Sequence, residues 1–541
     1  MKYALRSAAS VAMLAVVCLV ASAAVLFFAT VLFVAFSAGG VWSILAGIVV
    51  VGLLGVIGVG LLARRRRQKR RAREGVSITT EEQPLFWVEV YRVAEGLNMR
   101  PPDELLLFPD ASVAVSEART WLGVRPGVRR LHLGLPLLAG LTERELRAVV
   151  AQEFCRCWGP LSWGRLIYRG REIIGMVADR MGEESKVGRL VGRYGRAYLA
   201  VSSSVTRRYE LEAVRRSADL AGNDAATAAL SGHAVLNEGW SAFVDGYAGP
   251  AAAVGCRPEQ LFAGFTSFLD EPGRREQLAE AAVGAGPQQR SAYASQLVLE
   301  DRLAVIASLP ADDLHDKSGP ALGVMRNPDQ VIHRVEESMY HESGFVPATW
   351  ENIVPEAGVA AAREDALQLA RLGHEGGLGA TLSVEALMEL MGLGLVDEMV
   401  RPMLAAGASQ EAERHMAGRL VTGFLATAAI ESGTASYRFS WVAPRLLVDE
   451  RGVAEDLPQL VDAALADQGE IPALELWLES HRVGQTLELG ADLGQAVRED
   501  PSAPTTGNPG DPSVGPSGTS HDDSLDDPRA LLLPVSGTTS G

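Results

Sequence analysis

Residues 152–156 are the part of this chain whose types and spacing could support metal-dependent chemistry. They read Gln152-Glu153-Phe154-Cys155-Arg156, within a run of helical periodicity. On a helix, residues i and i+4 share a face, so two histidines at 152 and 156 would grip one zinc ion while the glutamate between them activated a water. Glu153 stands at the position of that general base. Gln152 and Arg156 stand where the two histidines would be.

A second motif follows at 206–214, which reads T-R-R-Y-E-L-E-A-V. Together with residues 82–84, 94–97, 135–138 and 141–151, the two motifs resemble the membrane-bound gluzincin zinc metallopeptidases of the HtpX and CAAX prenyl protease type. The resemblance covers residues 80–230. In that family the second motif is E-x-x-A-D, so the resemblance implies that Glu210 lies at the third zinc-ligand position and that Val214 replaces an aspartate.

The departures from the family pattern agree with one another. Gln152 and Arg156 replace two zinc ligands, and Val214 replaces a carboxylate of the kind that orients a ligating histidine. We therefore expect a pseudopeptidase with a binding or regulatory role, with no metal or other cofactor, in which Glu153 is the residual catalytic residue. The degenerate ligand positions are Gln152, Arg156 and Glu210.

Two other functions stay open. One is an active membrane zinc metalloendopeptidase with an altered site, for which zinc would be the cofactor. The other is a helical membrane scaffold whose C-terminal region binds a partner. If the metal is absent, a buried Glu210 needs a positive partner. Arg156 can supply it, so we predict an Arg156–Glu210 ion pair with Gln152 hydrogen-bonding nearby; the alternative is that Arg156 points to solvent.

Local signals predict the elements that position these residues. Short apolar or alternating runs at 105–108, 112–115 and 130–133, bounded by Pro, Asp and Gly, predict strands of a small sheet. Thr142 followed by Glu145 is typical of a capping box at the start of a helix, and the apolar face of that helix continues toward Cys157. A second long helix is expected over 196–221, ending near Gly222.

The remaining cysteines and histidines offer no ligand set. Cys155 and Cys157 are two residues apart and point in different directions on a helix, so they cannot both reach one ion. His132 falls on a predicted strand, where a structural histidine is the more common case.

The N-terminal region has the composition of a membrane anchor. No charged residue occurs between Ser7 and Ala63, and the run is broken near residues 37–40, which predicts two spans over 11–36 and 41–62. Eight basic residues follow at 64–73 and predict cytoplasmic ends for both spans. The predicted localisation is therefore a multi-pass protein of the cell membrane with a cytoplasmic soluble domain.

Three alternatives compete with this interpretation: a cleaved signal peptide, a basic run that binds nucleic acid, and a single re-entrant segment. The net charge is −16, and residues 1–73 hold ten basic and no acidic residues, so the rest of the chain carries −26. That acidity argues against nucleic acid as a partner. The expected partners are the lipid bilayer and an unknown protein.

The predicted fold class is α+β, with two N-terminal transmembrane helices, a zincin-like metallopeptidase domain and a mostly helical C-terminal region. The predicted domains are a transmembrane hairpin (1–63), a basic juxtamembrane segment (64–79), the metallopeptidase-like domain (80–315), a helical domain (316–498) and a disordered acidic tail (499–541). Four methionines at helical spacing in the helical domain are expected to fill its core: Met388, Met391, Met399 and Met403.

Overall fold

The structure is a computed structural model of the 541-residue chain. It describes residues 75–117, 127–158, 186–284, 299–312, 318–340, 344–378, 381–404, 408–484 and 488–489, and isolated positions elsewhere. Contacts between Cα atoms divide the chain into two compact units. Unit 1 comprises the described parts of 1–242 and 272–341, and unit 2 those of 243–271 and 342–531. The domain boundaries expected from the sequence stay a prediction.

Unit 1 is built around a four-stranded sheet of order β1-β2-β4-β3. Its strands are β1 (Val76–Ile78), β2 (Glu104–Phe108), β3 (Val113–Glu117) and β4 (Arg129–Gly134). The β2–β4 pair is parallel, with Leu105 opposite Leu131, and the other two pairs are antiparallel. The three strands expected from the sequence are confirmed within one or two residues at each end.

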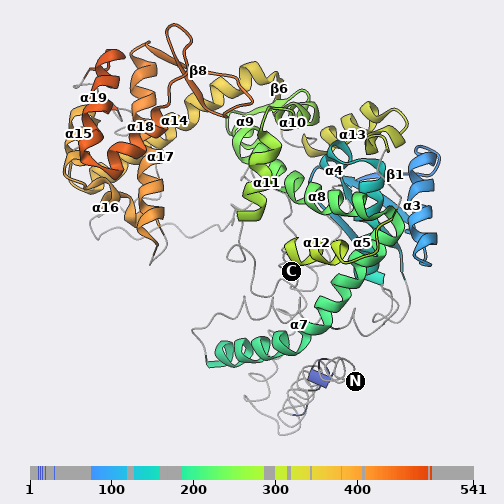
Figure 1. The fold of residues 1–541 in the computed structure, drawn as a ribbon. Coiled ribbons are helices and arrows are strands. Elements are labelled where there is room, and N and C mark those ends of the chain that lie inside the picture. The colour runs from blue at the N-terminus through green and yellow to red at the C-terminus, as the bar shows by residue number, and fades with distance from the viewer. Residues whose placement is uncertain are drawn as a thin grey trace, which may run out of the picture. The chain divides into compact units, whose positions relative to one another are not determined.

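Successive side chains of these strands point to opposite faces of the sheet, and one of the two faces is fully apolar. Leu105, Leu107, Leu131 and Leu133 have no solvent exposure. Helices α3 (Pro84–Gly96) and α5 (Glu143–Trp158) lie beside the sheet (Figure 1). The indole of Trp87 on α3 donates to the Ile78 carbonyl at 3.1 Å, which ties this helix to the edge strand β1.

The turn between β2 and β3 packs tightly against the end of β4. Gly134 donates its backbone N–H to the Ser112 carbonyl at 2.7 Å. A Cβ at position 134 would lie 1.7 Å from the Asp110 carbonyl oxygen, so only glycine fits without moving the turn. The short helix α4 (Leu135–Gly140) begins directly after this contact.

Two long helices complete the part of unit 1 that holds the sequence motifs. Helix α7 (Lys186–Ala221) packs along α5, and α8 (Asn223–Phe243) follows it after Gly222. Gly222 has φ 95°, a left-handed conformation that commonly ends a helix. The expected end of the second long helix is thus confirmed, although the helix begins ten residues earlier than predicted.

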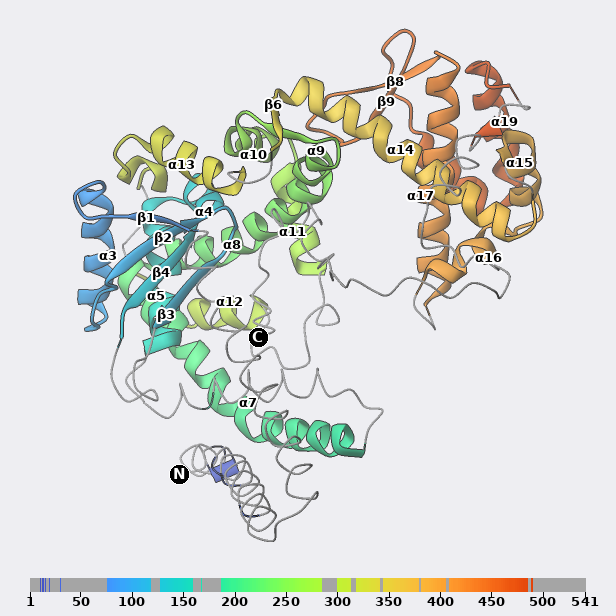
Figure 2. The same ribbon diagram turned by 180° about the vertical axis from the view of Figure 1, so that it is seen from behind.

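The rest of unit 1 is helical and follows later in the chain. It consists of α11 (Arg274–Gly284), α12 (Leu299–Ala307), the 3₁₀ turn η3 (Ala321–Val324) and α13 (Pro328–Tyr340). Helix α12 packs on α7, and α13 buries Val331, Val335 and Met339. Figure 2 shows α13 beside α4 and the sheet, and η3 packs against α4.

Unit 2 has a core formed by the helix pair α14 (Trp350–Glu375) and α17 (Gln410–Glu431). The two helices approach closely, since a Cβ on Gly423 of α17 would lie 2.4 Å from the Cβ of Asp365 on α14. Three of the four methionines expected in this core lie in or against it: Met391, Met388 and Met399. Met403 is 41% exposed, so the prediction is wrong for that residue.

Smaller elements surround this pair. They are η1 (Val244–Ala248), α9 (Gly249–Ala253), β5 (Cys256–Pro258), α10 (Leu261–Leu269), β6 (Val346–Ala348), β7 (Leu382–Ser383), α15 (Val384–Gly392), α16 (Val396–Val400), η4 (Arg401–Met403), β8 (Ala435–Arg438), β9 (Leu446–Asp449), α18 (Leu457–Ala466), η5 (Gln468–Glu470), α19 (Ile471–Ser480) and β10 (Glu488–Leu489). Six rings pack together in the described part of unit 2: Phe243, Tyr247, Phe265, Phe268, Trp350 and Trp441.

A buried carboxylate joins three segments of unit 2. The side chain of Asp365 on α14 is 8% exposed. Its Oδ1 lies 3.5 Å from Arg419 Nε on α17, and its Oδ2 lies 3.2 Å from Arg445 Nη1 in the segment before β9. Burial raises the pKa of Asp365, and the two arginines act in the opposite direction. We call these three residues the Asp365 cluster.

The two transmembrane helices in the expected fold class, and with them the multi-pass membrane localisation, need correction. Within the described residues, none of the helices has the length and apolar character needed to cross a bilayer. The longest described helix, α7, carries arginines throughout, among them Arg189, Arg196 and Arg208, and charges of this density are too costly in hydrocarbon. The spans expected over 11–36 and 41–62, the basic segment and the C-terminal tail lie outside the described residues, apart from isolated positions.

Candidate functional site

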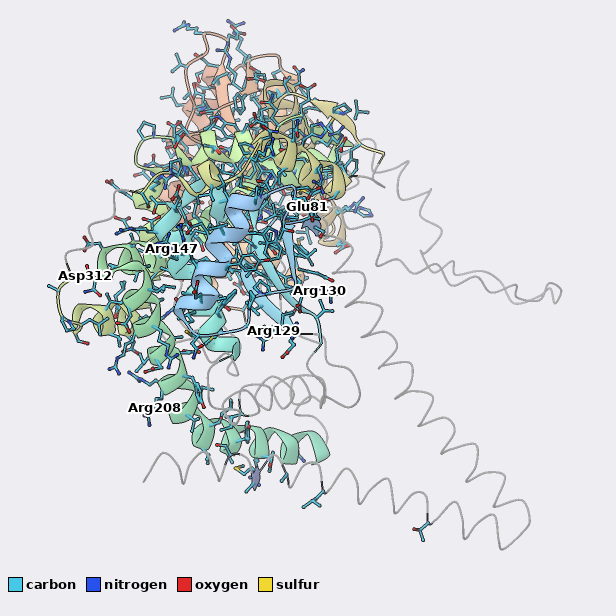
Figure 3. The ribbon with its side chains drawn as sticks, turned by 90° about the vertical axis from the view of Figure 1, so that its right-hand side faces the viewer. Glu81, Arg129, Arg130, Arg147, Arg208 and Asp312 are labelled. Atoms are coloured by element: carbon cyan, nitrogen blue, oxygen red, sulfur yellow. The ribbon has the colours of Figure 1, made fainter. Side chains whose placement is uncertain are left out.

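The motif helix α5 begins at the expected capping box. Thr142 donates its backbone N–H to the Glu145 carboxylate at 2.9 Å, and Glu145 donates its own to the Thr142 hydroxyl at 3.3 Å. These reciprocal bonds satisfy two donors that the first turn of a helix leaves unpaired. Arg147 also binds Glu89 of α3 at 2.6 Å, and Figure 3 shows it on this helix. The helix is therefore held at its start and along one side.

The motif residues lie in the interior of unit 1. Gln152, Glu153 and Cys155 are at most 9% exposed, and Phe154 has no exposure. Arg156 Nη1 lies 2.5 Å from Glu153 Oε1, one turn earlier on the same helix. The residue at a histidine position thus contacts the residue at the general-base position. A guanidinium supplies positive charge where the family pattern would place a metal.

Helix α7 brings the second motif against α5, as the resemblance implies. Glu210 is 5% exposed, and Val214 is fully buried beside it in sequence. An apolar side chain thus occupies the position of the family's aspartate. Arg156 forms an ion pair with Glu153 on its own helix. The pairing of Arg156 with Glu210, and the hydrogen bond expected from Gln152, stay predictions.

His233 on α8 is a residue that the sequence interpretation missed. It is largely buried, and burial lowers its pKa below 6.5. The charge of Glu153 and the backbone of Ala111 raise that pKa, whereas the charges of Arg302 and Arg156 lower it. His233 therefore lies close enough to feel both motif charges. Its position has no ligand spacing to the motif, so only the packing of α8 reveals it.

Cys155, the cysteine of the motif, has an unreactive thiol. Burial raises the pKa of Cys155 to about 11, so the side chain is a neutral thiol near pH 7. A thiolate is the form that attacks substrates and binds metals. The side chain of Cys157, two residues later, lies outside the described residues.

His132 has the structural role expected of it. On β4 its Nε2 lies 2.8 Å from the Ser116 hydroxyl, and its ring stacks near Phe108 with centroids 5.1 Å apart. Burial and, to a smaller extent, the positive charge of Arg130 lower the pKa of His132 to about 4. The ring is therefore neutral at pH 7 and packs within the sheet.

The side chains at the motif do not fit a zinc ion. The histidine positions hold an amide and a guanidinium, and zinc favours imidazole nitrogen and thiolate sulfur. Among the described residues, no group of three or more His, Cys, Asp and Glu side chains could hold a metal ion. The chemistry available at the motif is that of buried ion pairs.

The chain was compared with family models, curated proteins and solved structures. None of the family models, curated proteins or solved structures matches it. The resemblance to the gluzincin metallopeptidases therefore rests on the motif residues, and it stays a hypothesis about this chain.

Proposed function

We propose that residues 80–315 are a metallopeptidase-like domain that has lost zinc binding and proteolysis and acts as a binding or regulatory domain for a protein partner. The proposed descent of this domain from a metallopeptidase rests on the resemblance of the motifs. The side chains at the degenerate positions supply the argument for the loss.

The ion pair between Glu153 and Arg156 carries the proposal. A general base must be free to accept a proton from a metal-bound water. Glu153 instead contacts a guanidinium at 2.5 Å on the same helix, at a site where both side chains are mostly shielded from water. The carboxylate oxygen Oε1 is therefore already engaged in a charge-assisted contact. Glu153 is thus engaged with a guanidinium where an active peptidase would use it on a metal-bound water, and the two histidine positions beside it hold Gln152 and Arg156.

The most direct experiment rebuilds the ligand set. Gln152→His and Arg156→His together would restore two imidazoles at i and i+4 on α5, with Glu210 on α7 as the third ligand that the resemblance implies. We expect the unaltered chain, purified without chelators and given zinc, to retain little metal, and the double variant to retain about one zinc per chain. Metal content is read by mass spectrometry after desalting.

Matched controls separate a rebuilt site from adventitious zinc. Gln152→Ala with Arg156→Ala changes the same positions without adding ligands and should bind no more zinc than the unaltered chain. Glu153→Gln should leave peptidase assays of the unaltered chain unchanged. Stoichiometric zinc in the unaltered chain, with chelator-sensitive proteolysis that Glu153→Gln abolishes, would establish the active-peptidase alternative instead.

A further inference from the structure

A pocket of about 270 Å³ lies in unit 1, away from the motif residues. It is bounded by the turn that precedes α3 and by the turn and first residues of α13. Glu81, labelled in Figure 3, is one of the residues that line it. The two turns are far apart in sequence, so the fold alone brings them together.

One side chain builds the wall between the two turns. Gln83, 3% exposed, donates from its amide nitrogen to the Arg326 carbonyl at 2.6 Å. Its amide oxygen accepts the Arg326 backbone N–H, also at 2.6 Å. The Gln83 amide thus pairs with a peptide group as a neighbouring strand would. Because both bonds are formed, the backbone of Arg326 is fixed and its side chain is presented from a rigid point.

Several polar groups of the pocket are already engaged with one another. Arg334 binds Glu82 at 3.1 Å and the Ser77 carbonyl at 3.2 Å. Glu82 also accepts the backbone N–H of Thr79 at 3.1 Å. These groups hold the pocket together and have little capacity left for a ligand.

Two opposite charges at the pocket remain available. Within the part of the chain that the structure describes, neither the Glu81 carboxylate nor the Arg326 guanidinium forms a hydrogen bond or ion pair. The side-chain amides of Asn327 and Gln330 line the same space and are likewise uncommitted among the described residues. The pocket therefore offers a site for a cation, a site for an anion and two amides.

We propose that this pocket binds a small zwitterion of amino-acid to dipeptide size, with its ammonium group at Glu81 and its carboxylate at Arg326. Arginine suits a carboxylate because its planar fork can donate two parallel hydrogen bonds. The pocket is slightly smaller than the roughly 300–1,000 Å³ typical of sites for drug-sized ligands, which excludes ligands as large as a dinucleotide. The proposal is independent of the pseudopeptidase function.

Three probes that differ only in charge test the proposal on the full chain. Glycylglycine carries both charges, glycinamide carries only the ammonium, and N-acetylglycine carries only the carboxylate. Each exposed ion pair is worth roughly threefold to fivefold in affinity, so glycylglycine should bind at least about threefold more tightly than either single-charge probe. Glycine in a fourth arm distinguishes an amino-acid site from a dipeptide site. Titration by calorimetry or by ligand-observed NMR measures each affinity.

Two variants assign the charges. Glu81→Gln should weaken glycylglycine and glycinamide by about threefold and leave N-acetylglycine unchanged. Arg326→Gln should weaken glycylglycine and N-acetylglycine and leave glycinamide unchanged. Glu95→Gln and Arg275→Gln change exposed charges outside the pocket and should change none of the affinities.

The expected pattern depends on folded protein, which circular dichroism of each variant checks. Absence of saturable glycylglycine binding by the unaltered chain would overturn the proposal. So would affinities that Glu81→Gln and Arg326→Gln both leave unchanged.

Discussion

Two buried carboxylates of this protein are neutralised by arginine in different ways. Glu153 in unit 1 is paired with Arg156 on its own helix, three residues away. Asp365 in unit 2 is paired with Arg419 and Arg445, which come from two other segments. The first pair satisfies a charge, and the Asp365 cluster also holds three segments together. The burial of a carboxylate therefore does not by itself show how much of the fold depends on its ion pairs.

The difference has an energetic origin. An i, i+3 pair forms whenever its helix forms, so it adds little tertiary specificity. A carboxylate that recruits partners distant in sequence requires that the helices first pack, and it leaves a buried charge if the partners are removed. We expect substitutions in unit 2 to have the larger effects.

The largest effect should come from removing both partners of Asp365. Arg419→Gln with Arg445→Gln should lower the free energy of opening α14 and α17 by about 3 kcal/mol at pH 7. This is the lower end of the range for buried pairs, because the guanidiniums are 46% and 43% exposed. Hydrogen exchange in the two helices measures the opening free energy.

The cause of that loss can be separated from lost packing. Without the arginines, the pKa of Asp365 should rise further, since they now oppose the rise caused by burial. A carboxyl with a raised folded-state pKa stabilises the fold as the pH falls toward it, so the deficit should shrink between pH 7 and pH 5. Adding Asp365→Asn should recover most of the loss. A deficit that is the same at both pH values would contradict the electrostatic explanation.

The next largest effect concerns the close packing of α14 and α17 around Asp365 in unit 2. Gly423→Ala would place a Cβ 2.4 Å from the Asp365 Cβ and should destabilise the α14–α17 pair by about 2 kcal/mol, as overpacking does. Gly392→Ala on α15 is the matched control, because a Cβ there meets no atom within 4 Å. Exchange rates in α17 should rise for the first variant and stay unchanged for the second. Equal effects of the two substitutions would mean that the helices can move apart at no cost.

A smaller effect is expected at the motif. Arg156→Gln should cost about 1 kcal/mol in the opening of α5, since the pair is partly buried but local. Glu153→Gln in the same chain should restore part of the loss. Arg92→Gln tests the comparison, because Arg92 makes an i, i+3 pair with Glu89 but is 62% exposed. A cost for Arg92→Gln as large as for Arg156→Gln would show that burial at the motif is not the cause.

The last effect is a pH dependence of opposite sign in unit 1. The pKa of His132 is lowered to about 4 by burial, so between pH 6.5 and 4 the unfolded chain binds a proton that the folded chain does not. The stability of unit 1 should therefore fall as the pH falls through this window, by at most about 1.4 kcal/mol per pH unit. His132→Gln should reduce the slope. An NMR titration that places the His132 pKa at or above 6.5 would contradict this expectation.

Local signals in the sequence predicted much of unit 1. Thr142 and Glu145 form the capping box, Gly222 ends α7, and three short apolar runs form strands. In unit 2 the run before Asp449 forms β9, whereas residues 440–442, which resemble a strand equally well, lie outside every strand that the structure describes there. Runs of three residues carry too little periodicity to decide such cases.

The candidate site could be predicted only in part. The motif positions follow from spacing, but the approach of His233 depends on how α8 packs, and no spacing encodes it. The contact of Arg156 with Glu153, one turn earlier on the same helix, was not part of the sequence prediction, and the pairing with Glu210 across the helix interface stays a prediction. The membrane prediction depended on the apolar composition of residues 7–63, and none of the helices within the described residues supports it.

The close approach at Gly134 has a consequence for how this protein tolerates change. Any substitution there must displace the Asp110 carbonyl, and the turn that moves with it includes Ala111, whose backbone affects the pKa of His233. In a mutational scan, almost no substitution of Gly134 should be tolerated, although this residue lies outside the motif. Substitutions at position 134 should also change the environment of the His233 imidazole on α8, although that residue is distant in sequence.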